Sequence, residues 1–377
     1  MRVALAAPWF HPHVGGVESH VYSLAAELAR RGHEVTVLTS NYAKLPERES
    51  MDGFSVERVR CLGVVLRTPI TPALRKAVAP GRFDVVHAHS PPPLSAHYAS
   101  IACERTGTPL VTTYHCDLEI PTLLGNTLTG LYQRTYGRQA VRRAAKLIVT
   151  TETYAATSRV IWRYNPVVIP NPVDAQRFRP DVDGSAVRRR LGLSAKDRMV
   201  LLVGRVVPHK GIEHLVEAAK ELAYARVVIV GDGPFLPTVR RLAATFGVTD
   251  RVLFQGRVPF HDLPAYYAAC DVFVLPSVSR LEAFGIVALE AMATAKPVVV
   301  TDIPGVREVV TNGVEGLLAE PVNPPDLAAK INALLADPDL RAAMGARGRK
   351  KVESQFGIER ITDAVEAVYR SVTTRAA

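Results

Sequence analysis

The feature that most constrains the fold of this chain is an alternation, repeated in both halves, between short β-branched runs and longer stretches with helical periodicity. In the first half, the predicted strands are residues 2–7, 34–39, 83–89, 110–113 and 147–150. In the second half, they are residues 199–203, 226–230, 251–255, 271–275 and 297–301. Strands that alternate with helices pair in parallel and have both faces covered. The sequence therefore predicts two Rossmann-like α/β units.

The length of 377 residues also suits two domains of ordinary size. The segment VVIPNPVDAQRFRP between the halves has no periodicity from Pro170 onward, which is typical of an interdomain linker. We expect an N-terminal domain over residues 1–172, a C-terminal domain over 173–355, and a tail helix, 356–377, that crosses back to the first domain. Open α/β sheets bind ligands outside the carboxyl ends of their strands. The two sheets are therefore expected to face each other across a deep ligand-binding cleft.

The net charge of +10 is positive in both halves and favours an anionic partner. No recognisable nucleic-acid-binding motif is present, so phosphorylated small molecules or anionic lipid are the better candidates. No apolar run reaches the roughly 18 to 20 residues of a membrane span, and the opening MRVALAAPWF is too short for a signal peptide. The four cysteines are scattered without CxxC spacing, which argues against a disulfide framework or a zinc site. These features predict a cytoplasmic protein.

Two glycines follow the first predicted strand. Gly15 and Gly16 lie where a loop turns into a helix that runs to about Arg31. The start of a helix presents free N–H groups, and the absence of side chains lets a phosphate approach the backbone. The segment is neither GxGxxG nor a Walker loop, so a tight strand-to-helix turn without a ligand stays open as the alternative.

Two cations follow the first strand of the second half. In VLLVGRVVPHKG, Arg205 lies at a strand end and Lys210 at the start of the next helix. A planar guanidinium and a mobile ammonium together suit the neutralisation of a diphosphate leaving group. Both are expected to be exposed, and the alternative is a pair of solvated surface cations.

A glutamate pair marks the segment LEAFGIVALEAMATA. Glu282 and Glu290 are eight residues apart, about 12 Å if the segment is helical throughout. That spacing excludes a proton-sharing dyad and suits a long ligand, with Glu282 near a sugar and Glu290 near a ribose. The turn at Phe284, Gly285 and Ile286 is expected to present N–H groups to the diphosphate between them. The alternative is a solvated helix face, which the apolar neighbours disfavour.

Several short acidic or histidine pairs could suggest a metal. They are Asp181/Asp183, Asp337/Asp339, His11/His13 and His87/His89. The acidic pairs lie in turn-forming sequence, and neither histidine pair has a carboxylate or cysteine cluster nearby. We predict no metal site.

A run of cations in the first half has no acidic residue among it. It comprises Arg134, Arg138, Arg142, Arg143 and Lys146, accompanied by leucines and tyrosines. A basic amphipathic helix can lie on anionic lipid, and an ordinary helix with a solvated face is the alternative.

The ordered set of motifs GGVESH, IPNPVD, GRVVPHKG, GDGP and EAFGIVALE resembles that of family 4 of the glycosyltransferases, which have the GT-B fold. The resemblance covers nearly the whole chain. It implies a retaining, metal-independent enzyme without a cofactor. The chain has Pro172 where the family often has glycine, a departure at the linker that leaves the chemistry unchanged.

The resemblance also implies roles on the donor side. Arg205 and Lys210 would hold the diphosphate, Glu282 the sugar hydroxyls and Glu290 the ribose. The base would contact Gly256, Arg257 and Val258, which follow the strand VLFQG.

Two further roles fall in the first half. Gly15 and Gly16 would face the donor phosphates or the acceptor. His115, in TTYHCD, matches a family histidine near the transferred sugar. Taken alone, His115 could equally be a buried, hydrogen-bonded histidine at a strand end.

The implied activity is transfer of a hexose, with mannose the leading candidate, from a GDP- or UDP-sugar to a lipid-linked or cell-envelope glycan acceptor. The chain is similar to bacterial and archaeal phosphatidylinositol mannosyltransferases and would lie peripherally on the cytoplasmic face of the membrane. A catalytically inactive nucleotide-sugar-binding protein and a GT-B epimerase remain alternatives. A nicotinamide dehydrogenase is disfavoured because GxGxxG is absent.

Overall fold

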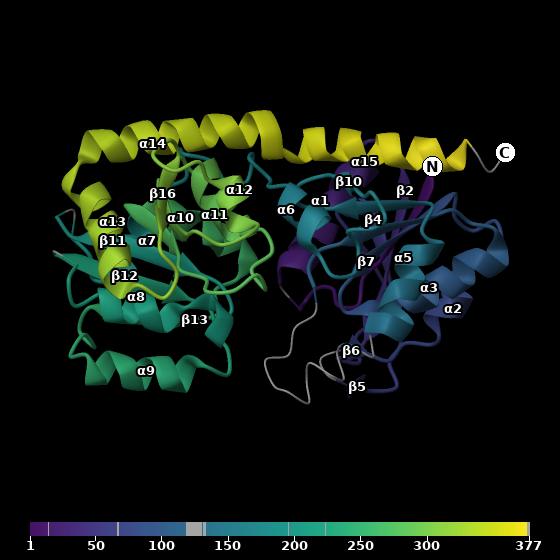
Figure 1. The fold of residues 1–377 in the computed structure, drawn as a ribbon, viewed down its shortest axis with the longest axis horizontal. Helices are drawn as coiled ribbons and strands as arrows, with labels where there is room; N and C mark the ends of the chain where they lie inside the picture. The colour runs from purple at the N-terminus through teal and green to yellow at the C-terminus, as the bar shows by residue number, and fades with distance from the viewer. Residues whose placement is uncertain are drawn as a thin grey trace. The chain divides into compact units, whose positions relative to one another are not determined.

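The computed structural model describes residues 1–13, 15–65, 68–117, 130, 133–194, 196–222 and 224–374 (Figure 1). The chain forms two compact units. The first comprises Met1–Pro172 together with Ile358–Ala377, and the second comprises Val173–Gly357. The chain thus leaves the first unit near Pro172 and returns to it with its last helix.

The first unit contains an eight-stranded sheet with the order β10-β9-β8-β7-β1-β2-β4-β3. All neighbours are parallel except β3, which pairs antiparallel with β4. The strands are β1 Arg2–Ala6, β2 Glu34–Asn41, β3 Arg48–Met51, β4 Phe54–Arg60, β7 Val85–Ser90, β8 Leu110–Tyr114, β9 Lys146–Val149 and β10 Val167–Val168. A separate pair consists of β5 Val64–Val65 and β6 Thr68–Pro69.

Helices cover both faces of this sheet (Figure 1). They are α1 Gly16–Arg30, α2 Leu74–Ala77, α3 Pro93–Thr106, α5 Arg138–Arg143, α6 Glu152–Thr157 and α15 Ile358–Thr373, with a π-helical turn η1 at Gln133–Gly137. Successive side chains of a strand point to opposite faces. Val3 and Leu5 therefore pack with α1 and α15, whereas Ala4 and Ala6 pack with α2 and α3.

The last helix, α15, is held on the first unit by an apolar stripe and by ion pairs. Its stripe consists of Ile361, Val365, Val368, Tyr369 and Val372. Arg31, just past α1, donates from Nη1 to Asp363 Oδ1 at 2.6 Å and to Glu366 Oε2 at 3.0 Å. The helical spacing of the stripe explains why this tail returns to an apolar surface.

The second unit contains a six-stranded, fully parallel sheet with the order β13-β12-β11-β14-β15-β16. The strands are β11 Arg198–Val203, β12 Ala225–Val230, β13 Val252–Gly256, β14 Val272–Leu275, β15 Val298–Thr301 and β16 Gly316–Ala319. Two apolar cores lie on its faces, one beneath α10 (Leu263–Ala269) and α11 (Ile286–Ala293) and the other beneath α8 (Ile212–Ala218), α9 (Leu236–Thr245) and α13 (Pro324–Ala336).

The helical elements of the second unit link successive strands and then lead back toward the first unit. They are α7 Ser185–Arg190, η2 Pro208–Lys210, α8 Ile212–Ala218, α9 Leu236–Thr245, η3 Phe260–Asp262, α10 Leu263–Ala269, α11 Ile286–Ala293, α12 Val306–Val309, α13 Pro324–Ala336, α14 Pro338–Lys351 and the π-helical turn η4 Val352–Phe356.

All ten predicted strands are present, with ends shifted by one or two residues. Several strands that the alternation did not predict are shorter or more polar. Examples are β3, with the sequence RESM, and β10, which has two residues. Such segments lack the buried β-branched run that identifies a central strand.

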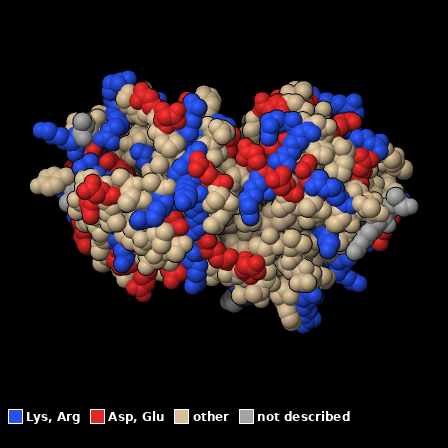
Figure 2. Space-filling model, turned by 90° about the horizontal axis from the view of Figure 1, so that it is seen from above, with Lys and Arg blue, Asp and Glu red and all other residues tan. Residues whose placement is uncertain are grey.

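None of the helices in the described part of the chain is both long and apolar enough to span a membrane. The excess positive charge does not form a continuous basic surface on the face drawn in Figure 2, where basic and acidic side chains interleave. The positive charge alone therefore does not mark a docking surface on that face.

Candidate functional site in the second unit and a histidine cluster in the first

The order of strands reverses between β11 and β14 in the second unit. From β11 the chain adds β12 and β13 on one side, and from β14 it adds β15 and β16 on the other. Loops that leave two such strands diverge and open a crevice at the carboxyl ends, where α/β sheets bind ligands. The candidate residues Lys210 and Glu282 lie on these two loops.

Lys210 and Glu282 form an ion pair that joins the two loops. Their side chains are 14% and 11% exposed, so the pair is mostly shielded from water. Ser277 donates a further hydrogen bond of 3.1 Å to Glu282 Oε2. Burial alone raises the pKa of Glu282, but the charge and hydrogen bond of Lys210 outweigh it and the pKa is lowered. Glu282 is therefore ionised at neutral pH.

This arrangement corrects two expectations about Lys210. It lies in the 3-10 turn η2 and not at the start of the next helix, and its side chain is not exposed. The adjacent Gly211, with φ of 61°, lets the turn pack against the loop after β14, since a Cβ there would lie 2.1 Å from Pro276 O. Close packing of the two loops thus buries Lys210 beside its partner.

Glu282 and Glu290 are not on one continuous helix as the spacing had suggested. α11 begins only at Ile286, and Gly285 before it has φ of 83°, a left-handed conformation that interrupts the helix. Phe284 is buried in the core. Glu282 therefore lies in the loop before the helix, and only Glu290 projects from it.

Glu290 is a buried carboxyl that accepts a hydrogen bond of 2.5 Å from Tyr267 Oη. Burial raises its pKa to about 7, partly opposed by the Tyr267 hydrogen bond and the charge of Arg177. The carboxyl thus titrates near neutral pH, and it is preorganised by a side chain from α10. Tyr267 carried no signal in the sequence, because its contact joins two separate helices.

The remaining donor-side candidates lie at the ends of β11 and β13. Arg205 follows β11 and is exposed, as expected. Gly256 ends β13 with φ of 65°, and Arg257 beyond it is exposed, with its Nε 3.7 Å from Asp232 Oδ2. Val258 packs partly on the core. All four residues thus lie at the carboxyl edge of the sheet.

In the first unit, Gly15 and Gly16 form the start of α1. Gly15 is the N-cap, with an extended backbone and no side chain to cap the helix. A Cβ on Gly15 would lie 2.4 Å from Glu18 Oε2. Because the end of the Glu18 side chain can move, this contact does not by itself require glycine, and both alternatives raised above stay open.

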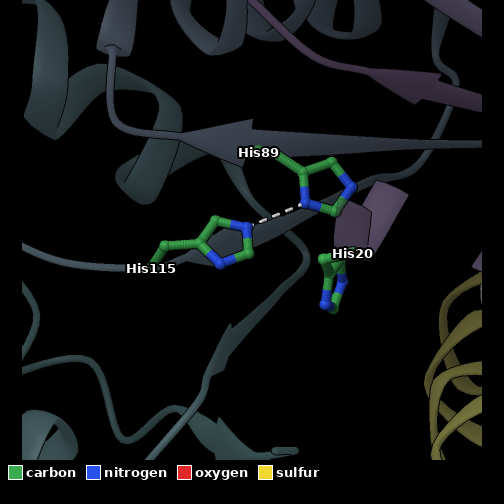
Figure 3. A group of neighbouring side chains, drawn as sticks. All are labelled: His20, His89 and His115. Atoms are coloured by element: carbon green, nitrogen blue, oxygen red, sulfur yellow. Dashed lines mark hydrogen bonds between the residues drawn. The ribbon is translucent and has the colours of Figure 1, made fainter. Parts of the chain in front are cut away.

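His115 lies just past β8 in a cluster of buried histidines (Figure 3). Its Nε2 is 3.1 Å from His89 Nδ1, and the His20 ring stands edge-on to both. Burial holds the pKa of His20 at about 4 and keeps the pKa values of His89 and His115 well below 6.5. The cluster is therefore neutral at pH 7.

The sequence did not point to His20, and it did not indicate that His89 and His115 lie together. His89 shares its face of the sheet with Val85, and Thr113 shares that face with Val111, because strand side chains alternate. This alternation, extended to His115, would have placed His89 and His115 together beneath α1.

Comparison with known proteins assigns the family. Residues 14–177 match the family described as Glycosyltransferase Family 4, and residues 185–351 match Glycosyl transferases group 1. The D-inositol 3-phosphate glycosyltransferase of Thermobispora bispora is 32% identical, over 95% of this chain and 92% of the relative. The chain belongs to the family 4 glycosyltransferases.

Two further similarities support the assignment of this chain to the glycosyltransferases. The GDP-mannose-dependent alpha-(1-6)-phosphatidylinositol monomannoside mannosyltransferase of Mycolicibacterium smegmatis is 30% identical, over 90% of this chain and 91% of the relative. Sucrose-phosphate synthase from Thermosynechococcus elongatus has a similar structure, with a TM-score of 0.85 and 25% identity, over 99% of each chain. The expected α/β class and GT-B fold are confirmed.

One cation of the basic run of this glycosyltransferase has an acidic partner among the described residues. Arg143 Nε lies 2.9 Å from Glu104 Oε2, an acidic residue from outside the run. Arg138 and Arg142 on α5 are exposed, and the side chain of Arg134 lies outside the described residues.

The acidic pairs of the glycosyltransferase form local turns and caps. Asp183 accepts hydrogen bonds from the backbone and side chain of Ser185. Asp337 caps α14 by accepting from Leu340 N at 2.8 Å. Asp181 and Asp183 lie in turn structure, as predicted, whereas Asp337 and Asp339 lie at the start of the helix α14 and not in a turn.

Proposed function

We propose that this glycosyltransferase transfers a hexose, with mannose the leading candidate, from a nucleoside diphosphate to an acceptor that contains inositol, with retention of anomeric configuration. The ion pair of Lys210 and Glu282 at the strand reversal is the observation that carries the proposal. It provides, at a ligand-binding edge, one group suited to a phosphate and one suited to sugar hydroxyls.

The donor is proposed to lie along the carboxyl edge of the second unit. Lys210 and Arg205 would take the charge that develops on the leaving diphosphate, together with the N–H groups at the start of α11. Glu282 would accept hydrogen bonds from the sugar and Glu290 from the ribose. Gly256, Arg257 and Val258 would contact the base. Because two cations already neutralise the diphosphate, no metal ion is needed on it.

The transfer step would use few protein groups. The acceptor oxygen attacks the anomeric carbon on the face from which the diphosphate leaves, and a donor phosphate oxygen takes the acceptor proton. The bond to the diphosphate breaks as the new glycosidic bond forms. His115 would lie near the transferred sugar, and Gly15 and Gly16 would contact the donor phosphates or the acceptor.

The acceptor class is supported by the names of two relatives, one acting on D-inositol 3-phosphate and the other on a phosphatidylinositol mannoside. The exposed Arg138 and Arg142 suit an anionic headgroup or membrane surface. We therefore include peripheral membrane association in the proposal, with a GDP- or UDP-hexose as the donor.

A matrix of donors and acceptors tests this function. GDP-mannose, UDP-glucose and an ADP-hexose are each incubated with D-inositol 3-phosphate or with phosphatidylinositol vesicles, and the product is analysed by mass spectrometry and NMR. The expected result is a glycosylated inositol product with the donor's anomeric configuration. Binding without transfer would indicate a nucleotide-sugar-binding protein, and donor conversion without an acceptor would indicate an epimerase. An inverted product would overturn retention.

A further inference from the structure

We propose that His20, His89 and His115 form a binding site for a divalent transition metal, with Zn²⁺ as its occupant. Each histidine offers one ring nitrogen, and the three nitrogens lie within 4.8 Å of one another (Figure 3). All three side chains are at least nine-tenths buried. The proposal departs from the sequence-based prediction of no metal site. It goes beyond the glycosyl transfer described above and shares only His115 with the proposed donor site.

The three ligands surround one topological position, two of them on regular elements and the third directly after a strand. His20 lies on α1, which follows β1; His89 lies on β7; and His115 follows β8. The strand order of the first unit reverses between β1 and β7, so the cluster occupies that sheet's own ligand-binding edge. A site on strand ends and a long helix is held more firmly than one built on loops.

Under-satisfied ring nitrogens favour a bound ligand here. Within the described part of the chain, the Nε2 of His89 is buried without a hydrogen-bond partner, and the buried His20 ring has Asn171 as its side-chain hydrogen-bond neighbour. Leaving buried polar groups unpaired is costly, so native proteins satisfy nearly all of them. A metal ion that accepts a lone pair from the His20 ring would remove part of this cost, whereas the Nε2 of His89 points away from a metal held by its Nδ1.

A neighbouring histidine shows what a satisfied imidazole looks like in the same core. His87 has Nδ1 2.7 Å from Tyr369 Oη and Nε2 2.6 Å from Thr113 Oγ1. Both of its nitrogens are therefore occupied, and it is excluded as a ligand. It forms one wall of the site and leaves the other three histidines as the ligand set.

The chemistry of the cluster selects the metal. Neutral imidazoles bind Zn²⁺ well, and burial keeps these histidines neutral at pH 7, so no proton competes. The described cluster contains neither the thiolates that favour softer metals nor the carboxylates that favour Mg²⁺ or Ca²⁺. Three histidines leave a fourth position for water or a substrate oxygen.

The geometry requires one adjustment, at His20. Tetrahedral Zn²⁺ with bonds of about 2.0–2.1 Å separates its ligand nitrogens by about 3.3 Å. His89 Nδ1 and His115 Nε2 are already 3.1 Å apart. Rotation of the His20 ring toward these two nitrogens would bring a third ligand nitrogen to the metal.

Metal binding can be measured without any enzymatic assay. Untagged full-length protein is stripped with a chelator, dialysed and titrated with Co²⁺ and Zn²⁺, and bound metal is counted by elemental analysis. We expect one equivalent per chain, a visible absorption band typical of tetrahedral Co²⁺ displaced by Zn²⁺, and an upward shift of the melting temperature with Zn²⁺.

Matched histidine variants assign the site. His20→Gln and His89→Gln should each weaken Co²⁺ affinity by more than about tenfold. His97→Gln, on α3 and outside the cluster, should leave it unchanged. Circular dichroism verifies folding, and His20→Asn replaces His20→Gln if the latter fails to fold. Less than a tenth of an equivalent of metal in the wild type, or equal binding by wild type and the cluster variants, would overturn the proposal.

Discussion

The ammonium of Lys210 is paired with the carboxylate of Glu282, 72 residues further along the chain, across the point at which the second sheet reverses its strand order. Because both side chains are mostly buried, the pair links stability to ligand binding. A diphosphate that takes up the Lys210 charge must compete with, or share, the existing interaction with Glu282. This relationship leads to the first prediction.

Lys210→Ala should lower kcat/KM by about 10²- to 10³-fold, because a preorganised cation for the leaving group is lost. It should also lower the free energy of unfolding by about 3 kcal/mol, because Glu282 is left buried and unpaired. The measurements are initial rates of nucleoside diphosphate release and urea unfolding. Lys220→Ala, which removes a half-exposed pair with Glu217, is the control and should change neither quantity strongly.

A double variant separates the two effects of Lys210. Lys210→Ala combined with Glu282→Gln removes both charges, so part of the lost unfolding free energy should return. The turnover should stay low, since the cation is still absent. Recovery of activity together with stability would contradict a role for Lys210 at the diphosphate.

Glu290 predicts a dependence of stability on pH. Its pKa is raised to about 7 in the folded protein from 4.5, so the folded state binds a proton more tightly than the unfolded state. The contribution of Glu290 to the free energy of unfolding is therefore fully present below about pH 4.5 and is lost as the pH rises through 7. Above pH 7, the wild type loses on the order of 3 kcal/mol of unfolding free energy through this group, and Glu290→Gln should not show that loss.

The measurement for Glu290 is chemical unfolding of wild type and Glu290→Gln at pH 5, 6, 7 and 8. The free energy of unfolding of the variant should increase relative to that of the wild type as the pH rises. Nucleotide affinity gives an independent readout, since ionised Glu290 accepts ribose hydrogen bonds better than the neutral acid. A constant difference between the two proteins across this range would refute the raised pKa.

The glycine at the end of β12 predicts a steric effect on the second unit. Gly231 has φ of 138°, and a Cβ there would lie 1.9 Å from Gly204 O. Gly231→Ala should therefore cost at least about 3 kcal/mol of unfolding free energy. Gly247→Ala, also at positive φ but with no atom within 4 Å, should cost only about 1 kcal/mol. Equal losses in thermal unfolding would show that backbone strain, not packing, governs both.

The exposed arginines of α5 predict salt-sensitive binding to anionic lipid. Arg138→Glu with Arg142→Glu should weaken binding to phosphatidylglycerol vesicles, measured by sedimentation, by at least about 30-fold, at roughly 1 kcal/mol per cation near the surface. Arg240→Glu with Arg241→Glu on α9 makes the same change in net charge at another exposed site. If both pairs reduce binding equally, net charge rather than α5 is responsible.

The sequence by itself determined the fold class and ten of the strands. Long β-branched runs between helical stretches have few solutions other than parallel sheets covered by helices. It also indicated Arg205, Lys210, Glu282 and Glu290, because each follows a strand or flanks an apolar helix. Strands that are polar or only two residues long, such as β3 and β10, have no hydrophobic pattern from which they could be predicted.

Only the tertiary structure decided which of these groups meet. Parallel pairing gathers the carboxyl ends of strands at one edge whatever their separation in sequence, so Lys210 reaches Glu282 and His20 reaches His89 and His115. Burial then set the charges, making Glu290 titrate near neutrality and keeping the histidines neutral. Protonation depends on solvent exclusion and on partners from distant segments, neither of which is written in local sequence.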